Sequence, residues 1–145
     1  MTAPPTPLDE EPHIHERPWM TLGVMAASLT LVVMSVSGLN VALPTIQESL
    51  EASNSALQWI IDSYALVFAG LLLMAGALGD RFGRRNALLV GLSIFATGAA
   101  VGGLAASAVQ VIAGRVVMGA GAAFVMPATL SLVVTVFPPK ERRRA

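Results

Sequence analysis

Cysteine is absent from this sequence of 145 residues, so the chain holds no disulfide framework and no thiol chemistry. Charge is scarce as well: 12% of the residues are charged, whereas an ordinary soluble domain carries roughly a quarter. No charged residue lies between Met20 and Leu43. A water-soluble domain is therefore disfavoured, and we expect the lipid bilayer to be the solvent of most of the chain.

Long apolar runs take the place of charge, since 54% of the residues are hydrophobic. Four runs are long enough to cross a hydrocarbon core of about 30 Å as helices. They cover about residues 19–43, 57–78, 87–108 and 109–137. The sequence therefore predicts an all-α membrane protein with four transmembrane helices. Pro44 is expected to end or kink the first helix, and Pro127 to bend the fourth.

Residues 1–18 differ in composition, with five prolines and four acidic residues. Such a segment buries too little apolar surface to offset its chain entropy, so we expect a disordered tail. Within it, His13 and His15 form an incomplete metal site, and a solvated tail is the preferred interpretation.

The basic residues indicate an orientation. Arg17 lies in the tail, three arginines follow the second run, and Lys140, Arg142, Arg143 and Arg144 close the chain. The two other loops contain no base. Because Lys and Arg accumulate on the cytoplasmic side, four spans with both termini in the cytoplasm place all eight bases inside. We therefore expect a multi-pass protein of the cell membrane.

Two charges lie within the runs, where a charge usually faces a cavity or a partner. Asp62 and Arg115 are predicted at similar depths from the outer side, so they could meet, and Asp62 could exchange a proton. Alternatively, Asp62 stays hydrated near the interface, and Arg115 is a structural tie to backbone carbonyls. For Asn40, a cavity contact and a helix-end cap or interhelix hydrogen bond both remain open.

Small residues mark expected packing faces, because they let membrane helices approach closely. Asp62, Ala65, Ala69 and Gly76 fall on one helical stripe, which we expect to face protein. In the third and fourth runs the expected packing positions are Gly98, Gly102, Gly119, Gly121 and Pro127.

The loop between the second and third runs combines glycine with charge, at Gly76, Gly79, Asp80, Arg81, Gly83, Arg84 and Arg85. Asp80 and Arg84 are spaced to pair across one helical turn. A simple basic anchor would need the arginines alone, so the ordered combination with Gly76, Asp80 and Gly83 argues for a further role of this loop.

Four segments of the sequence resemble motifs of a known protein family. Residues 76–85 are similar to the loop signature of the major facilitator superfamily, between its second and third helices. Residues 115–123 resemble the fourth-helix signature of its proton-driven antiporters. Residues 40–44 and 58–64 are similar to first- and second-helix motifs of the fourteen-span drug:proton antiporter group.

The resemblance implies part of the amino-terminal helix bundle of a secondary transporter that works by alternating access. It implies that Asp80, Arg81 and Arg84 help to latch the cytoplasmic side, partly against a second bundle, and that Arg115 takes part in proton coupling. The implied substrates are lipophilic, often cationic compounds exported in exchange for protons. The group's first-helix aspartate is replaced by Ser35, which leaves Asp62 or an acid elsewhere as the proton carrier.

Family members have twelve or fourteen spans, so we expect this chain to lack the carboxy-terminal bundle and to be inactive alone. A short dimeric exporter is an alternative, although such exporters place an essential acid in the first span, where this chain has none. A four-span module that assembles with other chains is another. No enzyme, cofactor, metal or nucleic-acid partner is expected, since no paired acids, ligand cluster or nucleophile with its base is present.

Overall fold

A computed structural model describes residues 18–136, and these residues form four α-helices in sequence. The helices are α1 (Pro18–Ser49), α2 (Asn54–Phe82), α3 (Arg84–Gly103) and α4 (Ala108–Val136). The predicted tail, apart from Pro18, and the predicted basic segment at 140–144 lie outside the described residues.

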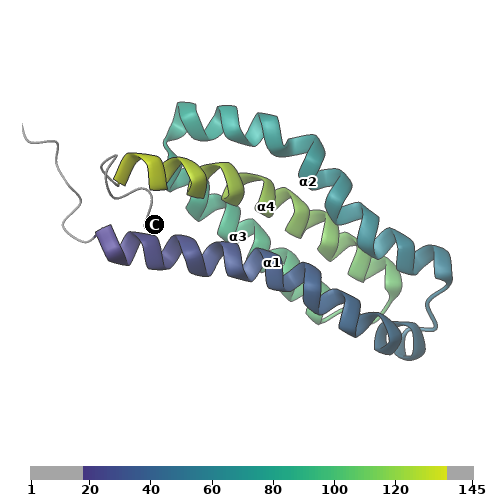
Figure 1. Cartoon of the computed structure of the whole chain (residues 1–145). Helices are drawn as coiled ribbons and strands as arrows, with labels where there is room; N and C mark the ends of the chain where they lie inside the picture. The colour runs from purple at the N-terminus through teal and green to yellow at the C-terminus, as the bar shows by residue number, and fades with distance from the viewer. Residues whose placement is uncertain (1–17, 137–145) are drawn as a thin grey trace, which may run out of the picture.

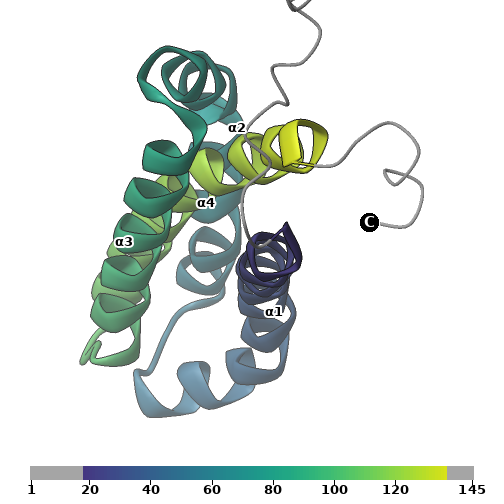
Figure 2. The same cartoon turned by 90° about the vertical axis from the view of Figure 1, so that its left-hand side faces the viewer.

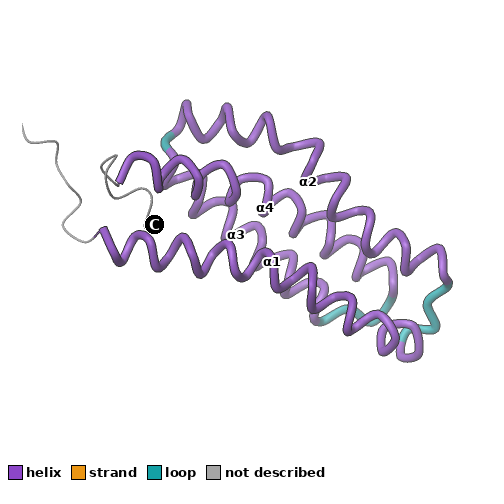
Figure 3. The backbone as a smooth tube through the Cα atoms, viewed as in Figure 1, coloured by secondary structure: helices purple, strands orange, loops and turns teal. Residues whose placement is uncertain are grey.

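The helices alternate in direction along a common long axis (Figures 1 and 3). One end of the bundle holds the start of α1, the junction of α2 with α3, and the end of α4; we call it the hinge end. The other end, here the far end, holds the connections at residues 50–53 and 104–107. The two ends of the described chain therefore lie at the same end of the bundle.

α4 is the central helix of the bundle. It packs extensively on α3 and on α2, and α1 covers a smaller part of it. One core cluster of buried side chains is drawn from all four helices: Val32, Tyr64, Ala87, Leu88, Phe95, Met118, Ala122, Val125 and Ala128.

The outward surface of the helices is apolar. Large side chains such as Val41, Leu73 and Leu130 are exposed, and each of the four helices is long and apolar enough to cross a membrane. A helix satisfies its own backbone hydrogen bonds, which is what a hydrocarbon solvent requires. The predicted all-helical membrane fold is confirmed.

The helix ends differ from the predicted spans. α1 does not end at Pro44 but continues to Ser49, and Figure 2 shows its last turns bent away from the rest of the helix. Proline lacks the N–H that would bond one turn back, and its ring crowds that carbonyl, so the helix bends there. α4 also contains a proline, Pro127, and Figure 2 shows the yellow end of α4 turned from the rest of the helix.

α3 ends at Gly103, earlier than residue 108, and a short connection leads to α4. Two side chains cap the amino-terminal end of α4. The Gln110 N–H donates to Ser107 Oγ at 3.4 Å, and the Ala106 N–H donates to Gln110 Oε1 at 2.7 Å. Ser107 and Gln110 thus resemble a capping box, which satisfies N–H groups that have no partner inside the helix.

Glycines bring α3 and α4 into backbone contact. A Cβ atom at Gly98 would lie 2.8 Å from the Gly114 carbonyl oxygen, and one at Gly114 would lie 2.8 Å from the Gly98 carbonyl oxygen. About two helical turns away, a Cβ at Gly91 would lie 2.9 Å from the Gly121 carbonyl oxygen, and one at Gly121 would lie 2.6 Å from the Gly91 carbonyl oxygen. Two reciprocal glycine pairs therefore set how closely these helices approach.

Candidate functional site

Arg115 is a buried cation between α2 and α4. It lies in α4, and its side chain is 5% exposed. Its Nε–H donates to the Ile60 carbonyl oxygen of α2 at 3.1 Å. Among the side chains described at 22–130, the ion pair present is that of Asp80 with Arg84, so no carboxylate pairs with Arg115 there. Arg115 is tied to a backbone carbonyl, one of the two interpretations open at the sequence level.

The second contact of Arg115 is the aromatic ring of Tyr64. The guanidinium carbon lies 4.3 Å from the ring centroid, within the range of a cation–π interaction. Tyr64 also stacks on Phe68, with ring centroids 6.2 Å apart and planes 2° apart. At Gly119 a Cβ atom would lie 2.6 Å from the Tyr64 carbonyl oxygen, so glycine lets α4 close on α2 beside the ring.

Asp62 does not lie against Arg115. Ile60 and Tyr64 are four residues apart and share the face of α2 that packs on α4, and both are buried. Asp62 lies midway between them in sequence, so its side chain points to the opposite side, about 200° around the helix. It is exposed in the structure. The predicted meeting of the two charges is therefore not present.

The same geometry overturns the expected protein-facing stripe on α2. Asp62, Ala65 and Ala69 are exposed, and Gly76 is half-buried. The face that packs on the bundle carries Ile60, Ser63, Tyr64, Ala75 and Gly79 instead. Small size does not by itself determine which side of a helix meets its neighbour, because a tyrosine can occupy an interface opposite a glycine.

Asn40 and Ser35 both bond within α1. The Asn40 Nδ2 group is 3.5 Å from the Val36 carbonyl oxygen, and its side chain is exposed. The Ser35 hydroxyl donates to the Val32 carbonyl oxygen at 2.7 Å. Neither side chain makes an interhelix hydrogen bond in the part of the chain that the structure describes.

The predicted central loop is almost entirely helical. Residues 76–82 form the last turns of α2, Arg84 begins α3, and Gly83 alone lies between them, with φ of 94°. Only glycine adopts this conformation without strain, so one residue reverses the chain. The junction is closed by the Ala87 N–H, which donates to the Gly83 carbonyl oxygen at 3.0 Å.

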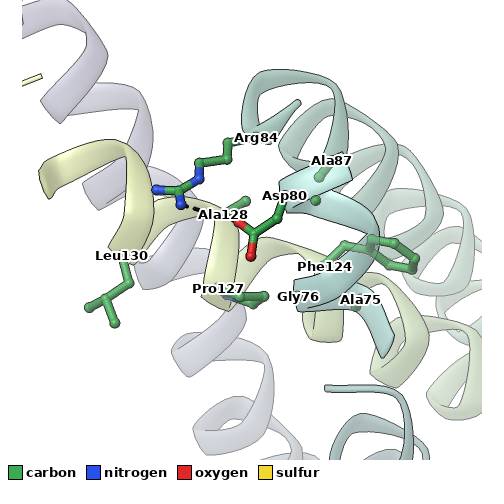
Figure 4. Close-up of a pocket in the computed structure, with 10 residues that line it drawn as sticks. Ala75, Gly76, Asp80, Arg84, Ala87, Phe124, Pro127, Ala128 and Leu130 are labelled. Carbon is green, nitrogen blue, oxygen red and sulfur yellow. Dashed lines mark hydrogen bonds and ion pairs between the residues drawn. The ribbon is translucent and has the colours of Figure 1, made fainter. Parts of the chain in front are cut away.

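Asp80 and Arg84 face each other across this junction. The Arg84 Nη2 donates to Asp80 Oδ1 at 3.1 Å, as Figure 4 shows. Both side chains are accessible, so the pair contributes at most about 1 kcal/mol to stability. The pair therefore fixes how the two side chains are oriented across the junction and adds little to the stability of the fold. Arg81 packs over the Phe82 ring at 5.6 Å, and Arg85 is exposed.

A pocket of about 400 Å³ opens beside the Asp80–Arg84 pair. Its apolar wall is formed by α4 at Phe124, Pro127 and Ala128, and α2 contributes Gly76 and Gly79 (Figure 4). Gly79 packs against Ala87 of α3, where an added Cβ would be 3.4 Å from the alanine methyl group. A larger apolar groove of about 780 Å³ lies next to it, between α1, α2 and α4. The glycines and Pro127 thus line open space at the hinge end, with one ion pair at its rim.

Replacing Gly83 with Ala is expected to lower the thermal stability of the protein. A side chain at positive φ costs about 1–2 kcal/mol, and relief of that strain would change the angle between α2 and α3. Gly103→Ala is a suitable control, because a Cβ there meets nothing within 4 Å and its φ is not positive. Equal unfolding temperatures for the two variants would contradict the prediction.

Tyr64, Gly91 and Gly114 are the residues that the sequence analysis did not single out as site or packing positions. Tyr64 had one available signal: it is the single tyrosine of the chain, and it lies in an apolar run where its polar ring requires a partner. The two glycines had none, since glycine is frequent in membrane helices.

Comparison with known proteins gives a consistent result. The family model of the Major Facilitator Superfamily matches residues 25–145. The methylenomycin A resistance protein of Streptomyces coelicolor is 43% identical over 119 residues, which are 82% of this chain and 25% of that protein. The multidrug efflux pump LfrA of Mycolicibacterium smegmatis is 40% identical over 128 residues, 88% of this chain and 25% of LfrA.

The methyl viologen resistance protein SmvA of Salmonella typhimurium is 38% identical over 127 residues, which are 88% of this chain and 26% of SmvA. The chain thus spans about a quarter of the length of the curated relatives that it matches.

Proposed function

We propose, from the premise that this chain belongs to the Major Facilitator Superfamily, that it forms part of the amino-terminal helix bundle of a proton-coupled drug exporter. The complete protein would sit in the cell membrane and exchange protons for lipophilic or cationic compounds by alternating access. We assign it to the fourteen-span drug:proton antiporter group, with both ends of the present chain in the cytoplasm.

The observation that carries this proposal is the buried Arg115 in an otherwise apolar bundle. A cation 5% exposed between two membrane helices is costly, and such residues mark substrate or proton pathways. The names of the relatives supply the substrate class: methyl viologen is a dication, and LfrA is called a multidrug efflux pump.

The hinge end provides the second part of the proposed mechanism. Asp80 and Arg84 hold the junction of α2 and α3 at the rim of an open pocket, with Arg81 beside them. We propose that this end lies in the cytoplasm and closes against the carboxy-terminal bundle of the complete protein when the transporter opens outward. Gly83 provides the positive-φ reversal that joins the two helices at this end.

Transport by inverted membrane vesicles tests the proposal. Vesicles that contain the complete protein and are acidic inside should accumulate ethidium and methyl viologen. Addition of either compound should release protons from the vesicle interior. Vesicles without the protein are the control. Accumulation that persists after a protonophore dissipates the gradient would contradict proton coupling.

Replacing Asp62 with Asn is expected to reduce substrate-induced proton release severalfold. Asp62 is the one acidic residue well inside the four described helices, and an exposed position on α2 leaves it accessible to protons or to a partner helix. Glu48→Gln, at the far end of α1, is the matched control. Proton release at the unaltered rate in Asp62→Asn would remove this residue from the coupling step.

A further inference from the structure

The guanidinium group of Arg115 is stabilised without a carboxylate. Its described contacts are one carbonyl oxygen at 3.1 Å and one aromatic ring at 4.3 Å. A buried charge is normally paired, because its loss of hydration is expensive. The negative face of the ring supplies part of the missing counter-charge.

The ring is held in place independently of the arginine. Tyr64 is 7% exposed and belongs to the core cluster. Phe68 supports it by parallel stacking, and the absence of a side chain at Gly119 fixes the distance between the backbones of α2 and α4. The Ile60 carbonyl lies one turn away on the same face of α2. A preformed cradle on α2 therefore receives the Arg115 side chain from α4.

We propose that Tyr64 is a positioning residue for Arg115: the face of its ring holds the guanidinium in a charged, oriented state between α2 and α4. This inference rests on the proposed function, because Arg115 would act in the transport cycle. A carboxylate would neutralise the cation and use its N–H donors in a fixed pair. A ring attracts the cation while leaving N–H groups of the guanidinium available to a substrate, to water or to an acid that approaches during the cycle.

Graded fluorination of the ring tests this role. Phe, 4-fluoro-Phe, 3,5-difluoro-Phe and 3,4,5-trifluoro-Phe can be placed at position 64 of the complete protein. Fluorine withdraws charge from the ring face with little change in shape. We expect the initial rate of proton-driven ethidium uptake to fall stepwise along the series, and Tyr64→Leu to lower it on the order of tenfold. Tyr64→Phe should recover most of the rate lost in Tyr64→Leu.

Phe95→Leu is the matched control, because it removes an aromatic side chain of the core cluster from α3 and leaves both Tyr64 and Phe68 in place. Its rate should be close to that of the unaltered protein. A rate that is the same across the fluorinated series would overturn the positioning role while leaving proton-coupled export intact. Absence of gradient-driven uptake by the unaltered protein would instead reject the proposed function.

A second measurement does not depend on transport. The thermal unfolding temperature of the same fluorinated variants should fall in the same order when Arg115 is present. In the Arg115→Met background, this dependence on fluorination should disappear, since no cation faces the ring. A dependence of equal size in both backgrounds would show that the ring acts by packing alone and would overturn the inference.

Discussion

Arg115→Met is expected to slow proton-driven export by the complete protein strongly and yet to leave its thermal stability unchanged or raised. The side chain lies 5% exposed between α2 and α4. Replacing a buried charge with an apolar side chain of similar volume removes a desolvation cost, which is often neutral or stabilising. Its Ile60 acceptor keeps its own helical hydrogen bond. The fold therefore does not need the arginine, whereas the proposed proton pathway does.

The expected loss of transport rate is on the order of 100-fold, the size typical when a preorganised charged or polar group is removed from a low-dielectric site. Arg115→Lys should recover only part of it, because an ammonium group lacks the planar fork that reaches the carbonyl and stacks on the ring at once. Initial rates of methyl viologen uptake and unfolding temperatures on the same preparations provide the comparison. If Arg115→Met were less stable but still transported, Arg115 would have a structural role and not the proposed role in transport.

Gly98→Ala is expected to destabilise the protein, whereas Gly102→Ala is not. The two glycines lie one turn apart on α3, so the same substitution is compared within one helix. At Gly98 the new methyl group would lie 2.6 Å from the Met118 backbone nitrogen and 2.8 Å from the Gly114 carbonyl oxygen. Backbone atoms cannot rotate away, so α3 and α4 must separate. At Gly102 a methyl group meets nothing within 4 Å.

Overpacking of this kind costs about 1–3 kcal/mol, and here the loss of close interhelix contact adds to it. Because α4 also carries Arg115, the separation of the helices should lower transport as well. Thermal unfolding in detergent micelles gives the first quantity and vesicle uptake the second. If Gly98→Ala unfolds at the same temperature as Gly102→Ala, the reciprocal glycine pairs do not determine the packing of α3 on α4.

The fold was predictable from the sequence because one property dominates it. Four apolar runs of about 20 residues or more favour four helices, since each run is long enough to cross the bilayer as a helix that satisfies its own backbone hydrogen bonds. Helix ends were less predictable. Charge and glycine at residues 79–86 were interpreted as a loop, but the helices extend past the apolar runs, and a single residue at Gly83 reverses the chain.

The candidate site was less predictable than the fold. Arg115 stood out because a charge inside an apolar run is conspicuous. Its partners did not stand out, because a backbone carbonyl has no sequence signature. The apparent partner was Asp62, the other charge inside an apolar run. Only the rotation of α2 shows that Ile60 and Tyr64 face α4 while Asp62 faces away. That rotation depends on packing between helices, which the periodicity of one helix does not contain.

The arrangement of the helices across the membrane is the claim on which the proposed gate and pathway depend. The chain contains no cysteine, so single cysteines can be introduced into it one at a time. Glu48→Cys and Ser107→Cys report on the far end, and Arg85→Cys reports on the hinge end. In intact cells, a membrane-impermeant maleimide should label the first two variants and should label Arg85→Cys only after permeabilisation. Labelling of Glu48→Cys and Arg85→Cys from the same side of the membrane would contradict the account.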